Sequence, residues 1–543
     1  MQTKTSNKPQ TNNISHINPG NEGFVTIRNG IYVDKTGLID VINKTINTAD
    51  KLTCISRPRR FGKTYTAKML CAYYDKTCDS EKLFSDLVIS KTDLYKNYLN
   101  ALNVVYIDIT GYISAAKKVS DVVKNIRQSL TEELISTFPA LQELNGKSIG
   151  DVFLAATKIN SEKFFFVIDE WDALFREQKD NLSLQEEYIN FLRELFKNGP
   201  VTDNVVAGAF MTGILPIKKY GHQSAISDFR EYTMVAPSLF AEYVGFTKKD
   251  IDSLAQNYKV NKTKLKTWYD GYSFPKVGSI YNPNSVCQAI RTQEYSSYWA
   301  KTETYAALLE YINLDTNGLQ GDIIQMIGGN SVPVDTSTFQ NDMTSSQSRD
   351  DVLSLLIHLG YIAYDSKSKT AKIPNEEIRE EFISTVRNGS HDATNRIISN
   401  SDQLIEDTIN GDENAVARAI EEAHSAGTFG IPPLFYNNEQ ALRSVVKFAY
   451  ISCANTYIKI EELPSGNGYA DIVYIPKPGT NRPVLLIELK ANDTANAAIA
   501  QIHANKYPKI FEGITGDIIL CGISYDRKTK HHICKIEKMT KHS

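Results

Sequence analysis

The sequence lacks paired cysteines, long hydrophobic runs and an excess of charge of one sign. Its seven cysteines are odd in number and contain no C-x-x-C pair, which argues against a zinc site or a disulfide framework and favours reduced thiols in the cytosol. No apolar run approaches the roughly 18 residues that a membrane helix needs, so we expect a cytoplasmic protein without a membrane segment. A net charge of −3 provides no global basic field, so nucleic-acid binding needs a local patch.

The length of 543 residues indicates about two to four domains, because it exceeds what one hydrophobic core can organise. Residues 1–20 are polar and have no apolar core of a signal peptide, so we expect a disordered lead-in. Changes of pattern further along separate residues 21–290, 291–430 and 431–543. We predict that these are a phosphate-loop domain, a helical or winged-helix-like connector, and a further α/β domain.

Residues 57–64 have the sequence RPRRFGKT and lie between a strand predicted over 52–56 and a helix predicted over 63–74. This is the layout of a phosphate-binding loop, in which Lys63 reaches the outer phosphate oxygens and the Thr64 hydroxyl holds Mg²⁺. The glycine expected five residues before Gly62 is replaced by Arg57, so a basic turn that caps a helix is the alternative. The predicted nucleotide-binding residues of the loop are Arg59, Arg60, Phe61, Gly62, Lys63 and Thr64.

A second apolar segment, KFFFVID at 163–169, predicts a central parallel strand that delivers Asp169 and Glu170 to its carboxyl end. In a phosphate-loop ATPase such an Asp meets Mg²⁺, and the next Glu polarises the attacking water. A further buried strand over 205–213 places Thr212 where it could sense the γ-phosphate. Ordinary roles remain open here: a helix cap for the acids and a turn for Thr212.

The flanking patterns predict supporting elements. We expect a hairpin over 24–33, a helix from Asp34 to about Asn47 with Asp34 as its cap, and a capping box from Thr247 to Asp250. The aromatic segment at 268–274 predicts a lid or support. A helix over 350–360 and a hairpin over 361–374 are typical of a winged helix, although a plain connector is favoured. Residues 376–424 hold twelve Asp or Glu against four Arg, so DNA should not lie along them.

The C-terminal region predicts a second site. A helix over 438–450 precedes strands over 457–462, 466–475 and 483–490, which carry Asp471, Glu488 and Lys490. Period-2 alternation points Glu488 and Lys490 to one face, toward an acid of the neighbouring strand. A surface Asp in a turn beside an exposed Glu–Lys strand edge is the alternative.

Hard carboxylates hold Mg²⁺ while leaving waters and a substrate phosphate in its coordination shell. Such an ion lowers the pKa of an attacking water, which Lys490 can orient or deprotonate. We expect Asp471 and Glu488 as metal ligands, with Glu439 and Glu462 as outer candidates. On the following helix Gln501 and Lys506 could contact the cleaved backbone. The basic tail at 527–541 could grip phosphates or could be a frayed terminus.

Six segments occur in an order that resembles one protein family: YVDKTGLID, RPRRFGKT, FVIDEWD, FMTGI, WYDGYSF and YNPNSV. They resemble the AAA-ATPase-like domain of a large microbial family that usually carries a C-terminal PD-(D/E)XK nuclease-like domain, which residues 436–510 resemble in turn. The resemblance implies an α/β fold: a P-loop NTPase-type parallel sheet with a helical lid, plus a C-terminal restriction-endonuclease-like domain. The family itself writes Arg at position 57. Departures are Trp171, where Tyr is usual, and Tyr469, which replaces an Arg.

These observations predict an ATP-binding protein whose ATPase module controls a nuclease dependent on Mg²⁺ or Mn²⁺. DNA is favoured over RNA as its nucleic-acid partner by analogy with the superfamily. The alternative is a nucleotide-switched nucleic-acid-binding or regulatory protein with an inactive nuclease-like domain. A further hypothesis is a homo-oligomer in which a neighbour supplies an arginine, with Arg59, Arg60 and Arg176 as candidates.

Overall fold

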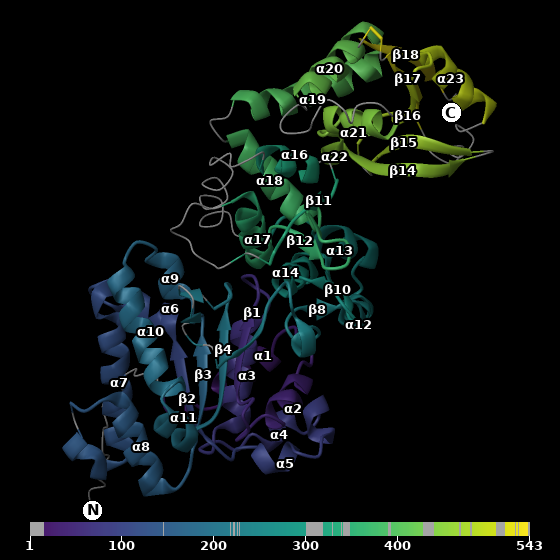
Figure 1. The fold of residues 1–543 in the computed structure, drawn as a ribbon. Coiled ribbons are helices and arrows are strands. Elements are labelled where there is room, and N and C mark those ends of the chain that lie inside the picture. The colour runs from purple at the N-terminus through teal and green to yellow at the C-terminus, as the bar shows by residue number, and fades with distance from the viewer. Residues whose placement is uncertain are drawn as a thin grey trace, which may run out of the picture. The chain divides into compact units, whose positions relative to one another are not determined.

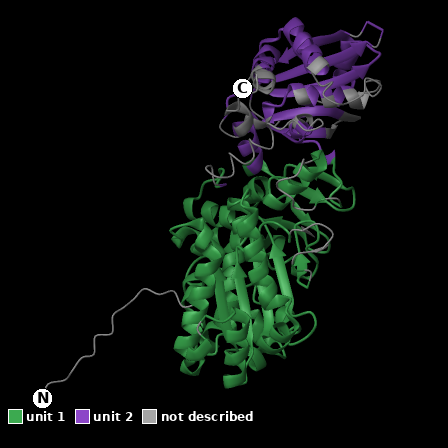
Figure 2. Cartoon of the chain, turned by 60° about the vertical axis from the view of Figure 1, so that its left-hand side comes forward, with its two compact units in different colours: residues 1–298, 333–377 green, residues 299–332, 378–543 purple. Residues whose placement is uncertain are grey.

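The computed structural model describes residues 16–540 except 145, 218, 221–222, 225, 227, 300–318, 328, 338, 340–347, 389–391, 427–438, 466–467, 478–479, 506–515, 527 and 530. The chain forms two compact units, which Figure 2 colours separately. Unit 1 comprises residues 1–298 and 333–377, and unit 2 comprises residues 299–332 and 378–543. These units divide residues 291–430 between them, whereas the division predicted above treats those residues as one connector; that division stays a prediction.

Unit 1 is built around a five-stranded sheet in the order β2-β3-β4-β1-β7, with all neighbours parallel. Every position of β1, β3 and β4 is buried, as expected for parallel strands covered on both faces. Since parallel strands end at the same edge, their polar end residues converge there. The strands are β1 (Leu52–Ser56), β2 (Asn103–Asp108), β3 (Phe164–Asp169), β4 (Val206–Gly213) and β7 (Arg230–Tyr232).

Helices cover both faces of this sheet (Figure 1). Phe166 on β3 packs against Phe153 and Phe196. The preceding residue, Phe165, points to the other face of the sheet and packs against Tyr74. The α-helices around the sheet are α1 (Glu22–Arg28), α2 (Gly37–Asn43), α3 (Lys63–Tyr74), α4 (Glu81–Phe84), α5 (Tyr95–Tyr98), α6 (Ile109–Ala115), α7 (Val122–Thr137), α8 (Ile149–Asn160), α9 (Ala173–Glu177), α10 (Leu182–Phe196) and α11 (Gly199–Val205). The predicted strands at 52–56, 163–169 and 205–213 and the helix at 63–74 are thus confirmed.

Two local predictions near the N-terminus are wrong. The predicted hairpin at 24–33 is instead helix α1 followed by a turn, because Phe24 and Ile27 lie three residues apart and are buried on one helical face. The N-cap of α2 is Thr36 rather than Asp34. Asp34 accepts hydrogen bonds from the backbone N–H of Thr36 at 2.8 Å and of Val88 at 2.7 Å, so it ties two segments together.

The rest of unit 1 follows the main sheet in the chain. A small sheet has the order β8-β10-β9, and the predicted capping box from Thr247 to Asp250 is confirmed at the start of α12. The helix and hairpin predicted over 350–374 are also confirmed. The elements are β8 (Phe246–Thr247), α12 (Lys248–Tyr258), α13 (Lys262–Tyr269), β9 (Tyr272–Phe274), β10 (Gly278–Tyr281), α14 (Pro283–Thr292), α17 (Arg349–Leu359), β12 (Ala363–Asp365) and β13 (Thr370–Lys372). The short strands β5 (Lys219–Tyr220), β6 (Gln223–Ser224) and β11 (Val332–Pro333) complete the strands described here.

The aromatic segment at 268–274 joins the phosphate loop to the segment that follows α17. Tyr272 packs edge-on against Phe61 of the loop, with ring centroids 5.4 Å apart, and its hydroxyl donates to the carbonyl of Gly360. The Asn375 amide donates to the carbonyl of Asp270 at 2.6 Å. The segment therefore supports the loop, one of the two roles predicted for it.

Unit 2 contains a mixed five-stranded sheet in the order β14-β15-β16-β17-β18. Only β16 and β17 are parallel, and the other neighbours are antiparallel. One face packs against α19, α20 and α21, and the other packs against α23. The elements are α16 (Leu319–Ile327), α18 (Glu376–Asn388), α19 (Asp392–Asn410), α20 (Glu413–Ala426), α21 (Glu439–Ala449), α22 (Cys453–Thr456), β14 (Tyr457–Ser465), β15 (Gly468–Pro476), β16 (Val484–Ala491), α23 (Ala495–Ala504), β17 (Ile518–Asp526) and β18 (His531–Met539).

The basic tail is part of this sheet rather than a frayed terminus, since its residues 531–539 form strand β18. The outer edge of β18 is covered by α20: Glu413 accepts from the backbone N–H of Ile536 at 3.0 Å, and Glu421 accepts from that of His532 at 3.4 Å. Capped N–H groups cannot pair with another strand, so this edge is protected from sheet extension.

Two expectations from composition can be compared with the structure. All seven cysteines are free thiols. None of the helices described here combines the length and the apolar character needed to cross a bilayer.

Substitution of Gly271 tests the contact between the aromatic segment and the segment after α17. Its φ of +115° disfavours any side chain, and an added Cβ would lie 1.9 Å from the carbonyl oxygen of Pro374. We expect Gly271→Ala to lower the free energy of unfolding by about 3 kcal/mol or more, measured by urea denaturation.

Gly278→Ala is the matched control in the neighbouring strand. Gly278 also has a positive φ, +81°, but nothing lies within 4 Å of its added Cβ. We therefore expect only the backbone cost of about 1–2 kcal/mol. Equal losses in the two variants would contradict the close contact at Gly271.

Candidate functional site

The phosphate loop of unit 1 leaves β1 at Ser56 and enters α3 at Lys63. Arg60 and Gly62 have left-handed φ values of +68° and +92°, which turn the loop tightly into the helix. Gly62 is the N-cap of α3, and no side chain caps this end. The first N–H groups of α3 are therefore available to an anion.

Arg57, which stands in the usual glycine position, points into the protein below the loop. It is fully buried, and its guanidinium donates to the carbonyls of Ser56 at 2.9 Å and Tyr232 at 3.0 Å. The guanidinium carbon lies 5.0 Å from the centre of the Phe274 ring. Burial lowers the pKa of Arg57 to about 9. This arginine consequently braces the loop against β7 and β9 instead of contacting a phosphate.

Lys63 and Glu170 form an ion pair, with the ammonium nitrogen 3.3 Å from a Glu170 oxygen. The other Glu170 oxygen accepts from Arg176 at 2.6 Å, and Arg176 also pairs with Asp172 at 3.0 Å. Although burial opposes ionisation, the charges of Lys63 and Arg176 outweigh it and lower the pKa of Glu170. Arg176 is held by acids of its own chain, which is not the geometry of an arginine offered to a neighbour.

Asp169 is buried at the carboxyl end of β3, and burial raises its pKa. The hydroxyls of Thr212 and Thr64 both hydrogen-bond to its carboxylate, and Tyr106 donates to it at 3.4 Å. The structure thus brings together the two residues predicted to hold Mg²⁺, Thr64 and Asp169. It also places Thr212 beside them, where its hydroxyl accepts from the backbone N–H of Glu170 at 3.3 Å.

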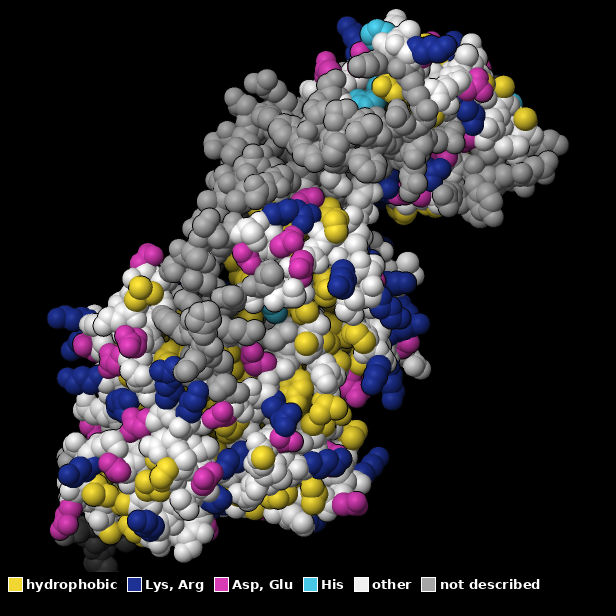
Figure 3. Space-filling model, viewed as in Figure 1, with side chains coloured by type: hydrophobic (Ala, Val, Ile, Leu, Met, Phe, Trp, Pro, Cys, Tyr) yellow, Lys and Arg dark blue, Asp and Glu magenta, His cyan; other side chains and the backbone are white. Residues whose placement is uncertain are grey.

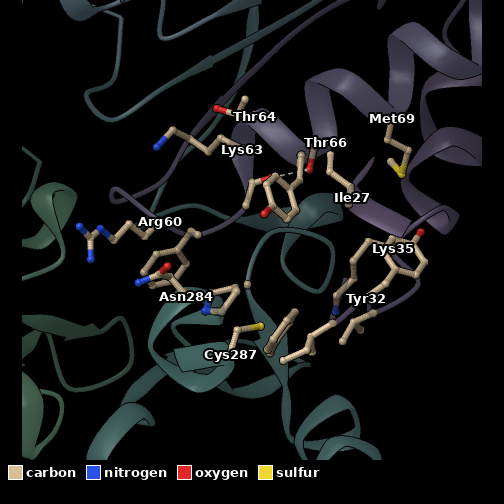
Figure 4. A pocket seen from close by; sticks show the side chains of 18 of the residues that line it. Ile27, Tyr32, Lys35, Arg60, Lys63, Thr64, Thr66, Met69, Asn284 and Cys287 are labelled. Carbon is tan, nitrogen blue, oxygen red and sulfur yellow. Dashed lines mark hydrogen bonds between the residues drawn. The ribbon is translucent and has the colours of Figure 1, made fainter. Parts of the chain in front are cut away.

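A pocket of about 270 Å³ opens beside the loop. Figure 4 shows Lys63 and Thr64 on one side of it, Tyr32 and Ile27 on another, and Asn284 and Cys287 on α14 opposite. Of the predicted nucleotide-binding residues, Arg60, Phe61, Gly62, Lys63, Thr64 and Glu170 line this pocket. Arg59, Asp169 and Thr212 do not line it.

In unit 2 the predicted acids lie on the adjacent strands β15 and β16. The pairing of the two strands ends at Ile472 and Ile487, and Asp471 and Glu488 are the next residues beyond that pair. One Asp471 oxygen accepts from the backbone N–H of Leu489 at 2.9 Å, which places this carboxylate beside β16. Its other oxygen accepts from the guanidinium of Arg443 on α21.

Glu488 and Lys490 lie together, as their alternation along β16 predicts. The Lys490 nitrogen is 3.8 Å from a Glu488 oxygen, and the Gln501 amide on α23 donates to the same oxygen. Glu488 is buried, whereas Asp471 and Lys490 are half-buried. Gln501 therefore contacts a predicted metal ligand instead of standing apart as a backbone contact.

Two carboxylates fit the needs of Mg²⁺, which commonly binds one or two carboxylates and fills its remaining positions with water and phosphate. Each acid has a cation beside it: Arg443 pairs with Asp471, and Lys490 lies near Glu488. These positive charges compensate the carboxylates. No group of three or more His, Cys, Asp or Glu side chains that could hold a metal is found in the described part of the chain. The backbones of Glu439 and Glu462 lie in α21 and β14, but their side chains are outside the described residues, as are the Tyr469 side chain and Lys506.

The sequence patterns missed three groups of site residues. Arg443 lies one helical turn after Glu439, so an i,i+4 search along α21 for cations as well as acids would have found it. The hydroxyl of Tyr106 donates to Asp169, and no local sequence motif identifies Tyr106 as a site residue. The pocket walls at Tyr32, Asn284 and Cys287 come from segments far apart in the sequence, so only the fold assembles them.

Comparison with known families identifies two domains in the chain. Residues 20–222 match the AAA-ATPase-like family model described as "Predicted AAA-ATPase", and residues 437–535 match the model of the PD-(D/E)XK nuclease superfamily. The chain therefore contains an AAA-ATPase-like domain and a C-terminal PD-(D/E)XK nuclease superfamily domain, as the sequence resemblance implied. A search of curated proteins returned no match.

Among solved structures, the chain is similar to two forms of the Aeropyrum pernix ORC2 protein. The ADPNP–ADP complexes have 12% sequence identity and a TM-score of 0.31, over 65% of this chain and 95% of that chain. The ADP form has 11% identity and a TM-score of 0.27, over 65% of this chain and 92% of that chain.

The Lys63–Glu170 pair gives a prediction for nucleotide affinity. Glu170 competes with an incoming phosphate for Lys63 and adds negative charge beside it. We expect Glu170→Gln to bind a fluorescent ATP analogue more tightly, by a factor on the order of 3–10 in an equilibrium titration. Glu177→Gln, an exposed change in α9, should leave affinity unaltered. Weaker binding by Glu170→Gln would show that the pair supports the site rather than competing with ligand.

Proposed function

We propose that this protein is a nuclease for DNA whose metal-dependent cleavage is controlled by an ATP-binding module. The observation that carries the proposal is the placement of Asp471 on β15 and of Glu488 and Lys490 on the adjacent strand β16 of a nuclease-superfamily domain. The AAA-ATPase-like domain, with its uncapped loop and polar strand ends, supplies the nucleotide site.

In unit 1 the triphosphate of Mg-ATP binds at the N-terminus of α3. Lys63 would pair with the outer phosphates in place of Glu170, and Thr64 and Asp169 are the residues that would hold Mg²⁺. Glu170, which is also bound to Arg176, would orient the water for hydrolysis. Thr212 links the two acids, since its hydroxyl touches Asp169 and the backbone N–H of Glu170. The pocket between α3 and α14 would take the base and ribose.

In the C-terminal domain Asp471 and Glu488 would hold a divalent ion, Mg²⁺ or Mn²⁺. When bound, that ion lowers the pKa of water and stabilises the charge that develops on the phosphate. Gln501 fixes the orientation of the Glu488 carboxylate through its amide. Lys490 lies 3.8 Å from Glu488 and is placed to orient the attacking water or to take its proton.

Unit 1 offers a surface for the DNA backbone. Exposed lysines on α12, on α13 and in the turn between them form a local basic patch despite the acidic net charge. Figure 3 shows Lys and Arg side chains gathered at the right-hand edge of the visible face of this unit. The patch consists of Lys248, Lys249, Lys259, Lys262, Lys264 and Lys266. Contacts of this kind bind phosphates without reading sequence.

We also propose the functional division suggested by the sequence: an ATPase-like part within residues 21–290, a connector at 291–430 and a nuclease part at 431–543. The formation of a homo-oligomer belongs to the same proposal. Arg59 and Arg60 remain candidates for an arginine offered to a neighbour, because both are exposed on the phosphate loop.

The nuclease proposal is tested by Asp471→Asn in the full-length protein. We expect cleavage of supercoiled, linear and single-stranded DNA with Mg²⁺ or Mn²⁺ to fall by a factor on the order of 100 or more, because one of two metal ligands is lost. ATP binding should be unchanged, since the nucleotide site lies in unit 1.

Asp493→Asn is the control, an exposed carboxylate just after β16 that contacts none of the proposed site residues through its side chain in the described structure. Wild-type protein that binds nucleotide and DNA but cuts no substrate, with or without ATP, would reject the nuclease. That outcome would favour the alternative, a nucleotide-switched binding or regulatory protein.

A further inference from the structure

Arg443 is a cation in the C-terminal site that none of the sequence motifs assigns. It projects from α21, and its guanidinium donates to one oxygen of Asp471. The side chain of Asp471 is 12% exposed and that of Arg443 is 22% exposed, so most of this pair is removed from water. The second Asp471 oxygen is occupied by the backbone N–H of Leu489. Arg443 therefore stands at the carboxylate oxygen that a metal ion needs.

The two donors to Asp471 differ in their freedom to move. The N–H of Leu489 belongs to strand β16, which is held between β15 and β17, so it cannot leave without breaking the sheet. The guanidinium of Arg443 stands at the end of a long side chain, which regains rotamer freedom when it swings away from Asp471. Binding of a divalent ion at Asp471 would thus displace Arg443 and keep the bond to Leu489.

The charges of the site favour such an exchange. Asp471 and Glu488 contribute two negative charges, and Arg443 and Lys490 contribute two positive charges, so the four side chains sum to zero. A divalent ion added to this set brings the sum to +2. Such a site attracts an anion, and the backbone of DNA offers one negative charge per phosphate.

We propose that Arg443 is the resident cation of the metal-free site, and that it gives up Asp471 to the metal ion and then binds a phosphate of the DNA strand beside the cleavage point. This inference rests on the proposed nuclease function. The planar guanidinium suits both partners, because its paired N–H groups match a carboxylate and a phosphate equally well. Arg443 is then a positioning residue whose two partners exclude one another.

Lys447 shows what a purely structural cation on the same helix looks like. It lies four residues after Arg443 on α21, and its ammonium pairs with Glu461 at 3.0 Å. Lys459 shares the same carboxylate at 3.0 Å. The described contacts of Lys447 do not involve Asp471 or Glu488. Removing its charge therefore breaks the ion pair with Glu461 without freeing a proposed metal ligand.

The experiment measures Mn²⁺ affinity by isothermal titration of the full-length protein without nucleotide. The heat that disappears in Glu488→Gln is assigned to the nuclease site. We expect Arg443→Gln to bind Mn²⁺ more tightly than wild type, by a factor on the order of 3–10, since a competing cation is removed. DNA cleavage by the same variant should fall about tenfold or more, because the phosphate contact is lost. A role in stability alone would not raise metal affinity.

Two further variants separate charge from shape. Arg443→Lys keeps the competing charge and loses the planar fork, so we expect near wild-type Mn²⁺ affinity with weakened cleavage. Lys447→Gln should match wild-type metal affinity. Circular dichroism and thermal unfolding establish that each variant is folded.

The results separate failure of this inference from failure of the proposed function. Unchanged or weaker Mn²⁺ binding by a folded Arg443→Gln protein, beside normal binding by wild type, would overturn the role of Arg443 and leave the nuclease intact. Absence of any heat that depends on Glu488, in both wild type and Arg443→Gln, would overturn both.

Discussion

Carboxylates that are largely removed from water, each with a cation beside it, are the feature on which both sites depend. Glu170 lies between Lys63 of the phosphate loop and Arg176 of α9. Asp471 is paired with Arg443 of α21, and Glu488 lies near Lys490. A buried charge without a partner is costly, so these pairings compensate the acids and hold them in place in the absence of ligand. They also mean that each ligand must replace a bond that already exists.

This constraint links recognition to specificity. In the proposed function, a triphosphate must attract Lys63 more strongly than Glu170 does, and a divalent ion must compete with Arg443 for Asp471. Neutral or weakly charged molecules cannot offer that exchange. The proposal therefore assigns ligands of high charge density to both sites, although the sites lie in unrelated sheets with different strand orders. The hydrogen bonds from Thr212 to Asp169 and from Gln501 to Glu488 fix the orientation of these two other carboxylates.

Arg57 illustrates how a departure from a motif can be explained by packing. On pattern alone an arginine in place of the first glycine weakened the case for a phosphate loop. In the structure its side chain points into the protein. Its guanidinium lies over the Phe274 ring and donates to the carbonyl of Tyr232. The aromatic segment at 268–274 thus packs against the phosphate loop. The close contacts of Gly271 and Tyr272 hold this segment in place. Position 57 is a support, and the phosphate-facing part of the loop begins after it.

The sequence by itself determined the elements that have a strong local signal. The apolar strand before Asp169, the Gly62-Lys63-Thr64 helix start and the alternation that pairs Glu488 with Lys490 all depend on residues close together in the chain. The short segment at 24–33 was mistaken for a hairpin because ten residues hold too few periods to separate alternation from a helical face. Only the tertiary structure decided which cation meets which acid. Arg443 and Asp471 are 28 residues apart and meet through packing of α21 against the sheet, and the pocket walls at Tyr32 and Cys287 are brought together in the same way. Such pairings depend on how helices dock on sheets, and no local spacing encodes that.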